Sequence, residues 1–205
     1  MAEAISVSGT VGAEDKVMSL ETGKLAGLAG GSVVVTMGKT TVLVTATANS
    51  SVRPGTDFFP LTVDYEERSY AAGKIPGSFF RREGRASEQA ILASRLPDRP
   101  LRPLFPEGFR NDVHVVATIL GADQENPYDV ISINAASAAL SISEIPFQGP
   151  LGCVRIAYDQ DGEWIAHPTY QEGEESTFEM VVAGRLLDND DVAVMMVEAG
   201  GTENA

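Results

Sequence analysis

The chain has 205 residues, of which 43% are hydrophobic, and its 29 acidic and 15 basic side chains leave a formal net charge of -14. This length can bury a sizeable core in one domain, and the negative charge excludes a protein that coats duplex DNA by neutralising its backbone. The single cysteine, Cys153, excludes a disulfide within the chain and fits a reducing compartment. Because the chain has no apolar run near the roughly 20 residues of a membrane span and no basic-then-apolar start, we expect no membrane contact, no signal peptide and a cytoplasmic location.

The first third of the chain predicts strands. Residues 1–16 are small and polar, so we expect a flexible N-terminal segment and a core domain that covers residues 17–205. Strands are predicted from β-branched or alternating patterns at residues 32–37, 41–48 and 59–65. The short link Gly38-Lys39-Thr40 makes the first two of these strands a hairpin.

Positive charge is concentrated in the segment from Lys74 to Arg110. It holds eight Lys and Arg against four Asp and Glu, a net of +4, so the other residues together carry -18. One Arg-rich strip on an acidic body indicates a local anion site, because arginine suits bidentate phosphate recognition and stacking on bases. Single-stranded nucleic acid is the natural candidate ligand.

The aromatic part of this segment is Phe79-Phe80-Arg81-Arg82, in a loop bounded by Gly and Pro. Exposed aromatic rings stack on bases without sequence preference, at about 1–3 kcal/mol per base, and neighbouring arginines hold phosphates. The alternative is a phenylalanine pair that closes the edge of the core beside two solvated arginines.

The remainder of the segment predicts a short helix followed by an extended arm. Ser87 is a plausible N-cap, Arg95 lies near the helix end, and Pro97 is expected to stop the helix. Proline then recurs at every third position up to Pro106, which favours polyproline II structure. That period would align Arg99, Arg102 and Phe105 along one edge, with two leucines packed inward. Two alternatives remain for this proline-rich segment. It is a rigid crossover arm whose arginines are paired with acidic residues, or it is a ligand for a proline-binding partner.

The second half predicts one buried helix and further strands. Residues 129–143 are apolar or small nearly all round, which is typical of a helix buried on most sides. Strands are predicted at residues 113–120, 151–158, 163–167, 178–183 and 192–197. With seven or eight strands, mostly in pairs, and two helices, an α+β fold with a mixed or antiparallel sheet is expected.

Residues that carry reaction chemistry are sparse. His114 and His167 lie in strand patterns without a carboxylate or cysteine at ligand spacing, and an exposed turn explains Asp64, Glu66 and Glu67 better than a cation site does. The sequence therefore assigns no catalytic residue and no metal ligand to this chain. Because the chain stops directly after a strand, we also expect that it is a piece of a longer protein.

Four stretches resemble one known family. They are Leu20–Ala26, Asp57–Phe109, Ile133–Gly152 and Met180–Arg185. In this order they resemble polynucleotide phosphorylases over nearly all of residues 17–200. The resemblance implies the first of two ribonuclease PH-like core domains (a ribosomal protein S5 domain 2-like fold), followed by linking helices, a second core domain and KH and S1 modules.

The activity implied by this resemblance is the degradation of single-stranded RNA from its 3′ end by a homotrimeric ring. Inorganic phosphate attacks the terminal linkage and releases nucleoside diphosphates, Mg²⁺ is required, and the reverse reaction makes RNA. The resemblance implies that Mg²⁺ and most catalytic groups lie outside this chain, and that partners include single-stranded RNA and RNA-degradation proteins.

Seven residues match the family's RNA-contacting positions. The resemblance places Phe79 and Phe80 at the aromatic constriction through which RNA threads, with Arg81 and Arg82 beside it. Further arginines of the RNA path are Arg95, Arg99 and Arg102.

Two departures from the family pattern are visible. Pro97 replaces an aliphatic residue, and Val181 occupies the place where the second core domain has a lysine. An apolar Val181 cannot neutralise phosphoryl charge, so this chain is expected to guide RNA and build the ring without performing the reaction. The alternatives are a self-contained ribonuclease PH-type enzyme and a non-catalytic RNA-binding ring subunit of an exosome-like assembly.

Overall fold

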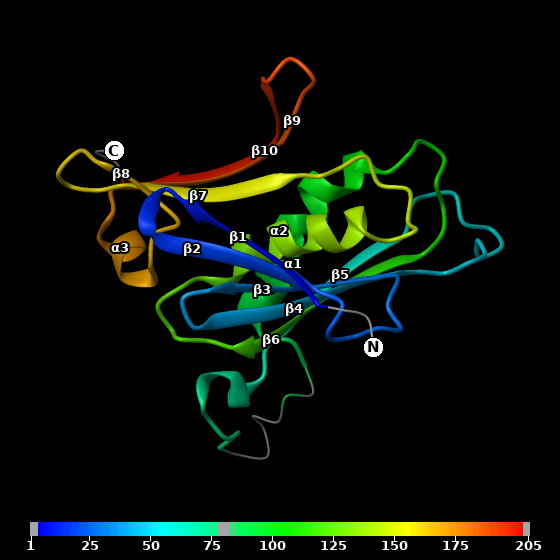
Figure 1. Ribbon diagram of the computed structural model, residues 1–205, viewed down its shortest axis with the longest axis horizontal. Helices are drawn as coiled ribbons and strands as arrows, with labels where there is room; N and C mark the ends of the chain where they lie inside the picture. The colour runs from blue at the N-terminus through cyan, green and yellow to red at the C-terminus, as the bar shows by residue number, and fades with distance from the viewer. Residues whose placement is uncertain (1–3, 78–82, 84, 203–205) are drawn as a thin grey trace.

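Two sheets and the helices between and beside them make up the fold in the computed structural model, which describes residues 4–77, 83 and 85–202 (Figure 1). The six-stranded sheet has the order β1-β2-β3-β4-β6-β5. Its strands are β1 (Ile5–Val11), β2 (Ala13–Thr22), β3 (Gly31–Met37), β4 (Thr40–Ala48), β5 (Leu61–Glu66) and β6 (Val113–Gly121). All neighbours pair antiparallel except β5 and β6, so the sheet is mixed and the expected α+β class is confirmed.

The second sheet is four-stranded and antiparallel, with the order β10-β9-β7-β8. Its strands are β7 (Gly152–Tyr158), β8 (Trp164–Ala166), β9 (Phe178–Leu186) and β10 (Val192–Gly201). The three acidic residues between β9 and β10, Asp188, Asp190 and Asp191, form a polar hairpin turn.

The N-terminal segment corrects one expectation. Residues 5–11 form strand β1, and β2 begins at Ala13, where a loosely ordered segment was expected up to residue 16. The two strands pair through their backbones from Ile5↔Thr22 onward, and nearly all side chains of β1 are exposed. The sequence of β1 does alternate, with Ile5, Val7 and Val11 on one face and Ser6, Ser8 and Thr10 on the other, but the strand buries little of its apolar face.

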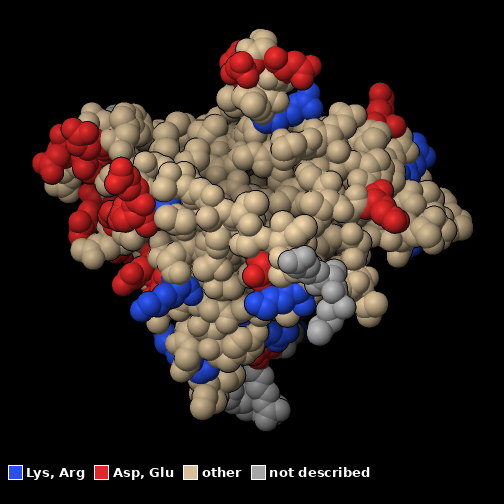
Figure 2. Space-filling model, in the orientation of Figure 1, with Lys and Arg blue, Asp and Glu red and all other residues tan. Residues whose placement is uncertain are grey.

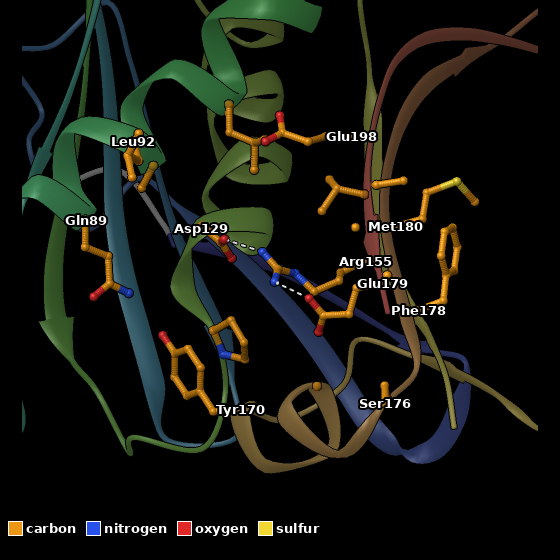
Figure 3. Close-up of a pocket in the computed structure, with 18 of the residues that line it drawn as sticks. Gln89, Leu92, Asp129, Arg155, Tyr170, Ser176, Phe178, Glu179, Met180 and Glu198 are labelled. Atoms are coloured by element: carbon orange, nitrogen blue, oxygen red, sulfur yellow. Dashed lines mark hydrogen bonds and ion pairs between the residues drawn. The ribbon is translucent and has the colours of Figure 1, made fainter. Parts of the chain in front are cut away.

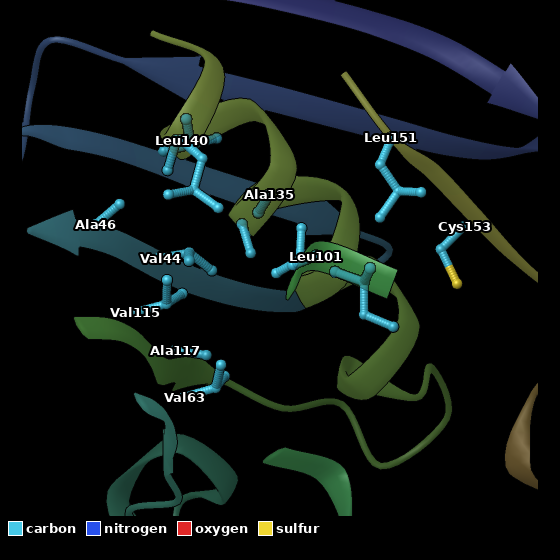
Figure 4. Packing of buried hydrophobic residues seen from close by; sticks show 14 of the residues in the cluster. Val44, Ala46, Val63, Leu101, Val115, Ala117, Ala135, Leu140, Leu151 and Cys153 are labelled. Carbon is cyan, nitrogen blue, oxygen red and sulfur yellow. The ribbon is translucent and has the colours of Figure 1, made fainter. Parts of the chain in front are cut away.

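The helix α2 (Tyr128–Ser141) is buried between the two sheets, as its apolar sequence predicts (Figure 1). It contacts β3 and β4 on one side and β7 on the other. Gly31 allows the closest approach, because a Cβ at this position would lie only 2.0 Å from the carbonyl oxygen of Ala139. The core is formed by alternate residues of β3, β4, β5 and β6 packed against this helix and the end of α1 (Figure 4).

The helix α1 (Glu88–Leu101) corrects the second expectation, because Pro97 does not end it and no polyproline II arm follows. The Ser87 side chain caps α1 as predicted, and the helix runs through Pro97 and Pro100 into the short 3₁₀ helix η3 (Arg102–Leu104). Both prolines and Leu101 are buried. Their packing compensates for the two backbone hydrogen bonds that the proline rings remove.

Two short helices complete the described part. The 3₁₀ helix η1 (Ser69–Ala72) follows β5, and α3 (Tyr170–Glu175) follows β8. A capping box in which Thr169 and Glu172 each bind the other's backbone starts α3. Within the described residues, no helix is long and apolar enough to cross a membrane.

Candidate functional site

The predicted anion-binding arginines of α1 fall into two different environments. Arg95 and Arg99 are one helical turn apart, so they share a face of α1, and both are exposed. The guanidinium of Arg99 donates from Nη1 to Oε2 of Glu198, on β10, at 3.0 Å. Both side chains of this ion pair are 57% exposed, so Arg99 can exchange Glu198 for another anion.

Arg102 has a structural environment instead. Its Nη1 donates to the carbonyl oxygen of Phe59 at 2.8 Å, and Nη2 donates to Oδ1 of Asp98 at 2.6 Å and to the carbonyl oxygen of Leu61. The guanidinium also lies over the Phe59 ring, 5.6 Å from its centroid. Arg102 therefore ties the end of α1 to the start of β5, and the expected row of Arg99, Arg102 and Phe105 does not form, because Phe105 is buried.

The aromatic and arginine group Phe79, Phe80, Arg81 and Arg82 lies outside the described residues. Of the neighbouring residues, Glu83 accepts a hydrogen bond from the backbone N–H of Ser69 and lies 3.8 Å from Arg68. The Ser69 hydrogen bonds, followed by the Arg68 charge, lower the pKa of Glu83. Glu83 therefore stays ionised and connects this part of the loop to η1.

A cleft of about 580 Å³ adjoins α1 (Figure 3), and it is called the α1 cleft below. It lies between α1, the start of α2 and strands β9 and β10, and its lining includes Leu92, Tyr128, Arg155, Phe178 and Glu198. The Arg99–Glu198 ion pair joins α1 to β10, two of the elements that form this cleft. The sequence had indicated the arginines of α1 but not this cleft.

The charged group in the α1 cleft is a triad of Arg155, Asp129 and Glu179 (Figure 3). Arg155 Nη2 lies 2.5 Å from Oδ2 of Asp129, and its Nη1 lies 3.2 Å from Oε2 of Glu179. Two carboxylates therefore neutralise this guanidinium. One sequence signal could have revealed the triad. Arg155 lies two residues from both Cys153 and Ala157 in β7, so it shares their buried face, where a charged side chain needs a partner.

Two tyrosines, Tyr128 and Tyr170, also line the α1 cleft. Burial, and after it the negative charge of Asp129, raises the pKa of Tyr170 to about 12. Burial and a hydrogen bond to Glu67 likewise raise the pKa of Tyr128. These phenols keep their protons at neutral pH.

The two histidines occupy contrasting places. His114 is exposed on β6, and its Nε2 lies 2.8 Å from Oδ2 of Asp64, a partner that sequence spacing did not reveal because β5 and β6 pair across 50 residues. His167 is buried, and burial, followed by the charges of Lys16 and Arg155, lowers its pKa to about 4. His167 is therefore neutral at physiological pH.

The described residues do not form a metal site of their own. Across residues 4–77, 83 and 85–202, no group of three or more His, Cys, Asp or Glu side chains is arranged to hold a metal ion. In the α1 cleft, Asp129 and Glu179 are committed to Arg155. These residues thus do not fit a Mg²⁺ ion.

Comparison with known families finds a match to the 3′ exoribonuclease family, domain 1, over residues 14–146. Two polyribonucleotide nucleotidyltransferases are similar over nearly the whole chain. The protein from Acidothermus cellulolyticus is 57% identical over 98% of this chain, and that from Salinispora arenicola is 57% identical over 92%. The chain spans about a quarter of the length of these curated relatives, 25% and 24%.

Among solved structures, the crystal structure of rice (Oryza sativa) Rrp46 has a similar fold. The TM-score is 0.69, and the match covers 90% of this chain and 80% of the rice chain. With 16% sequence identity, this similarity concerns the fold alone.

Proposed function

Because the chain belongs to the 3′ exoribonuclease family, we propose that residues 17–205 are the first ribonuclease PH-like core domain of a phosphate-dependent 3′-to-5′ exoribonuclease. The match to polyribonucleotide nucleotidyltransferases over 98% and 92% of the chain supports this proposal. The role proposed for this domain is to guide single-stranded RNA and to contribute to a homotrimeric ring.

The proposed reaction of the whole protein is phosphorolysis. A phosphate oxygen attacks the phosphorus of the terminal RNA linkage, the bond from phosphorus to the 3′ oxygen breaks, and a nucleoside diphosphate leaves while the shortened RNA takes a proton at its 3′ oxygen. Cations must neutralise charge at the phosphorus in the transition state.

The described residues support a guiding role for this domain better than a catalytic one. Val181 is buried on β9, and the guanidinium of Arg155 in the α1 cleft is already paired with two carboxylates. We therefore propose that phosphate and Mg²⁺ are bound by other parts of the longer protein. A cytoplasmic location and association with RNA-degradation proteins complete the proposal.

The observation that carries the RNA-guiding role is the exposed pair Arg95 and Arg99 on α1 in an otherwise acidic molecule. Figure 2 shows acidic side chains gathered at the β9–β10 turn and around β8 and α3, while Lys and Arg lie mainly in the lower half of the view. A polyanion is therefore repelled most strongly near the β9–β10 turn and near β8 and α3. The proposed path extends to Phe79, Phe80, Arg81 and Arg82 on the preceding loop.

A binding experiment on the full-length protein tests this role. The double variant Arg95→Ala/Arg99→Ala should weaken single-stranded RNA binding about tenfold or more at low salt, and the slope of log affinity against log salt should fall by about 1 for each lost phosphate contact. Arg53→Ala is the matched control, because Arg53 is also exposed but pairs with Asp112 in another loop. An unchanged salt slope in the double variant would remove α1 from the RNA path.

A second measurement tests where the reaction takes place. ADP release from poly(A), with Mg²⁺ and phosphate, should occur with the full-length protein and not with the 205-residue chain. ADP production by the short chain above a phosphate-free control would instead favour a self-contained ribonuclease PH-type enzyme. If the full-length protein binds RNA but releases no ADP, the non-catalytic ring subunit becomes the better account.

A further inference from the structure

Two buried side-chain nitrogens near the end of β8 have no hydrogen-bond partner among the described residues. They are Nε of Arg155 and Nε2 of His167. His167 is only 6% exposed. A buried polar atom without a partner costs about 1–3 kcal/mol, so an arrangement that satisfies both atoms is strongly favoured.

The same small cavity is lined by both residues. It measures about 10 Å³, counted as the space open to the centre of a water molecule, which is close to the smallest volume that holds one water. Met37, Asn126, Pro127, Val130 and Pro168 complete the wall. The backbones of the two residues are neighbours, because the His167 N–H donates to the Arg155 carbonyl oxygen at 2.7 Å.

The two nitrogens have complementary hydrogen-bonding roles. Arg155 Nε carries a hydrogen and can only donate, while its Nη atoms already donate to Asp129 and Glu179. His167 is neutral at physiological pH, since its pKa is lowered to about 4, and a neutral imidazole has one nitrogen that accepts. A water molecule can accept from the first group and donate to the second.

We propose that this cavity binds one ordered water molecule, which accepts a hydrogen bond from Arg155 Nε and donates one to His167 Nε2. Asn126 also lines the cavity, and its side-chain amide can accept the second proton of the water. A metal cation is disfavoured because it would face the Arg155 guanidinium, and polyatomic anions exceed the space.

This water has a defined structural role. Its bond to Nε, together with the Asp129 and Glu179 bonds, would give each of the three guanidinium nitrogens of Arg155 an acceptor and fix the plane of the group in the α1 cleft. It would also connect β7 to His167, whose backbone has φ of 47°, a conformation unusual for a residue other than glycine. Such a residue is held in place only when its surroundings specify it.

The tautomer of His167 provides the first test. The proposal requires the hydrogen on Nδ1 and a bare Nε2, which long-range ¹H–¹⁵N correlation spectra of the imidazole ring distinguish directly. The chain has only two histidines, so the exposed His114 serves as an internal reference. A hydrogen on Nε2 at neutral pH would place two donors at the cavity and would overturn the proposal.

A crystal structure at about 1.5 Å provides the second test. We expect one water peak within about 2.7–3.2 Å of both nitrogens. Density without such a peak, or a direct contact that fills the cavity, would contradict the proposal. The variant His167→Asn keeps an acceptor and tolerates the positive φ, so the water should remain, whereas His167→Leu lacks the acceptor and should lose it. Because the wild-type spectra decide the tautomer, failure of either variant to fold leaves the proposal testable.

Discussion

Asp123 is the residue at which two backbone segments meet. Its carboxylate accepts hydrogen bonds from the backbone of Lys39, the hydroxyl of Thr40 and the backbones of Glu125 and Asn126, at 2.8–2.9 Å. The tip of the β3–β4 hairpin is thereby joined to the loop that leads from β6 into α2. Gly38 permits this contact, because a Cβ there would lie 2.5 Å from the Asn126 side chain.

We predict that Asp123→Asn lowers the free energy of unfolding by about 2–3 kcal/mol, because charge-assisted hydrogen bonds are lost and an NH₂ group then faces donors. Urea unfolding measures this change. Asp188→Asn, in the exposed β9–β10 turn, is the control and should stay within about 0.5 kcal/mol of the wild type. Equal losses in both variants would show that the position of the charge is immaterial.

The same carboxylate predicts a pH effect. Partial burial raises the pKa of Asp123, but hydrogen bonds from Asn126, Glu125 and Lys39 outweigh burial and hold the pKa well below its usual range. A pKa lower in the folded than in the unfolded state stabilises the fold above the unfolded value of about 3.9, and that stability is lost as the pH falls below it. Between pH 5 and pH 3, wild-type protein should therefore lose more stability than Asp123→Asn.

Arg102 and Arg95 were both predicted to contact RNA, but their alanine variants should differ in stability. Arg102→Ala removes hydrogen bonds to two carbonyl oxygens and to Asp98, so it should lower the free energy of unfolding by about 2 kcal/mol. Arg95→Ala should change it by less than about 0.5 kcal/mol, because Arg95 is exposed. Thermal unfolding of the two variants checks this, and an Arg102→Ala variant as stable as the wild type would contradict the structural role of Arg102.

At the scale of elements, α1 depends on its N-cap residue, Ser87. Ser87 Oγ accepts the backbone N–H of Ala90 at 2.9 Å and donates to Glu67 at 2.5 Å. Ser87→Ala should destabilise the protein by about 1 kcal/mol, measured by urea unfolding. Ser94→Ala, within the same helix, is the matched control, because its hydroxyl bonds only the Ile91 carbonyl and alanine favours helix. A loss no larger than that of the control would contradict the capping role.

The sequence predicted most helices and strands, but it misjudged the prolines of α1 and missed the short helix α3. Hairpins and the α2 helix followed from alternation and all-round apolarity, because these patterns report burial directly. Pro97 and Pro100 were misjudged because local proline rules do not include the core that both rings contact. The α3 helix was missed although Thr169 and Glu172 show a capping-box pattern, because six residues are too few to show a helical period of apolar residues.

The candidate site was predictable only where charge stood out along the chain. Arginines are conspicuous in an acidic sequence, so Arg95 and Arg99 were predicted as RNA contacts from the sequence alone. The Arg155–Asp129–Glu179 triad joins positions 24 and 26 residues apart, and only the pairing of β7 with β9 and α2 brings them together. Such contacts require the tertiary structure.

At the scale of the whole molecule, the second sheet contacts α1 through the Arg99–Glu198 ion pair. Any RNA phosphate that binds Arg99 must displace Glu198 or share its guanidinium with it. In the full-length protein, Glu198→Gln should therefore raise RNA affinity about two- to threefold at low salt, and less at high salt. Fluorescence anisotropy with a labelled oligonucleotide measures this.

The control for this variant is Glu144→Gln, which makes the same change of charge at an exposed position after α2. An equal gain in both variants would assign the effect to net charge, and no gain in Glu198→Gln would show that Arg99 does not take part in binding.

Because β6 lies between β4 and β5 in the sheet, this part of the sheet cannot assemble during translation until β6 has been synthesised. β4 ends at Ala48 and β5 at Glu66, yet both pair with a strand that ends only at Gly121. During translation, the β3–β4 hairpin therefore leaves the exit tunnel with one edge unpaired. Strand β5 has no partner strand until α1 and β6 have been synthesised. The nascent chain carries an open strand edge over this interval, when a chaperone or a neighbouring nascent chain can bind it.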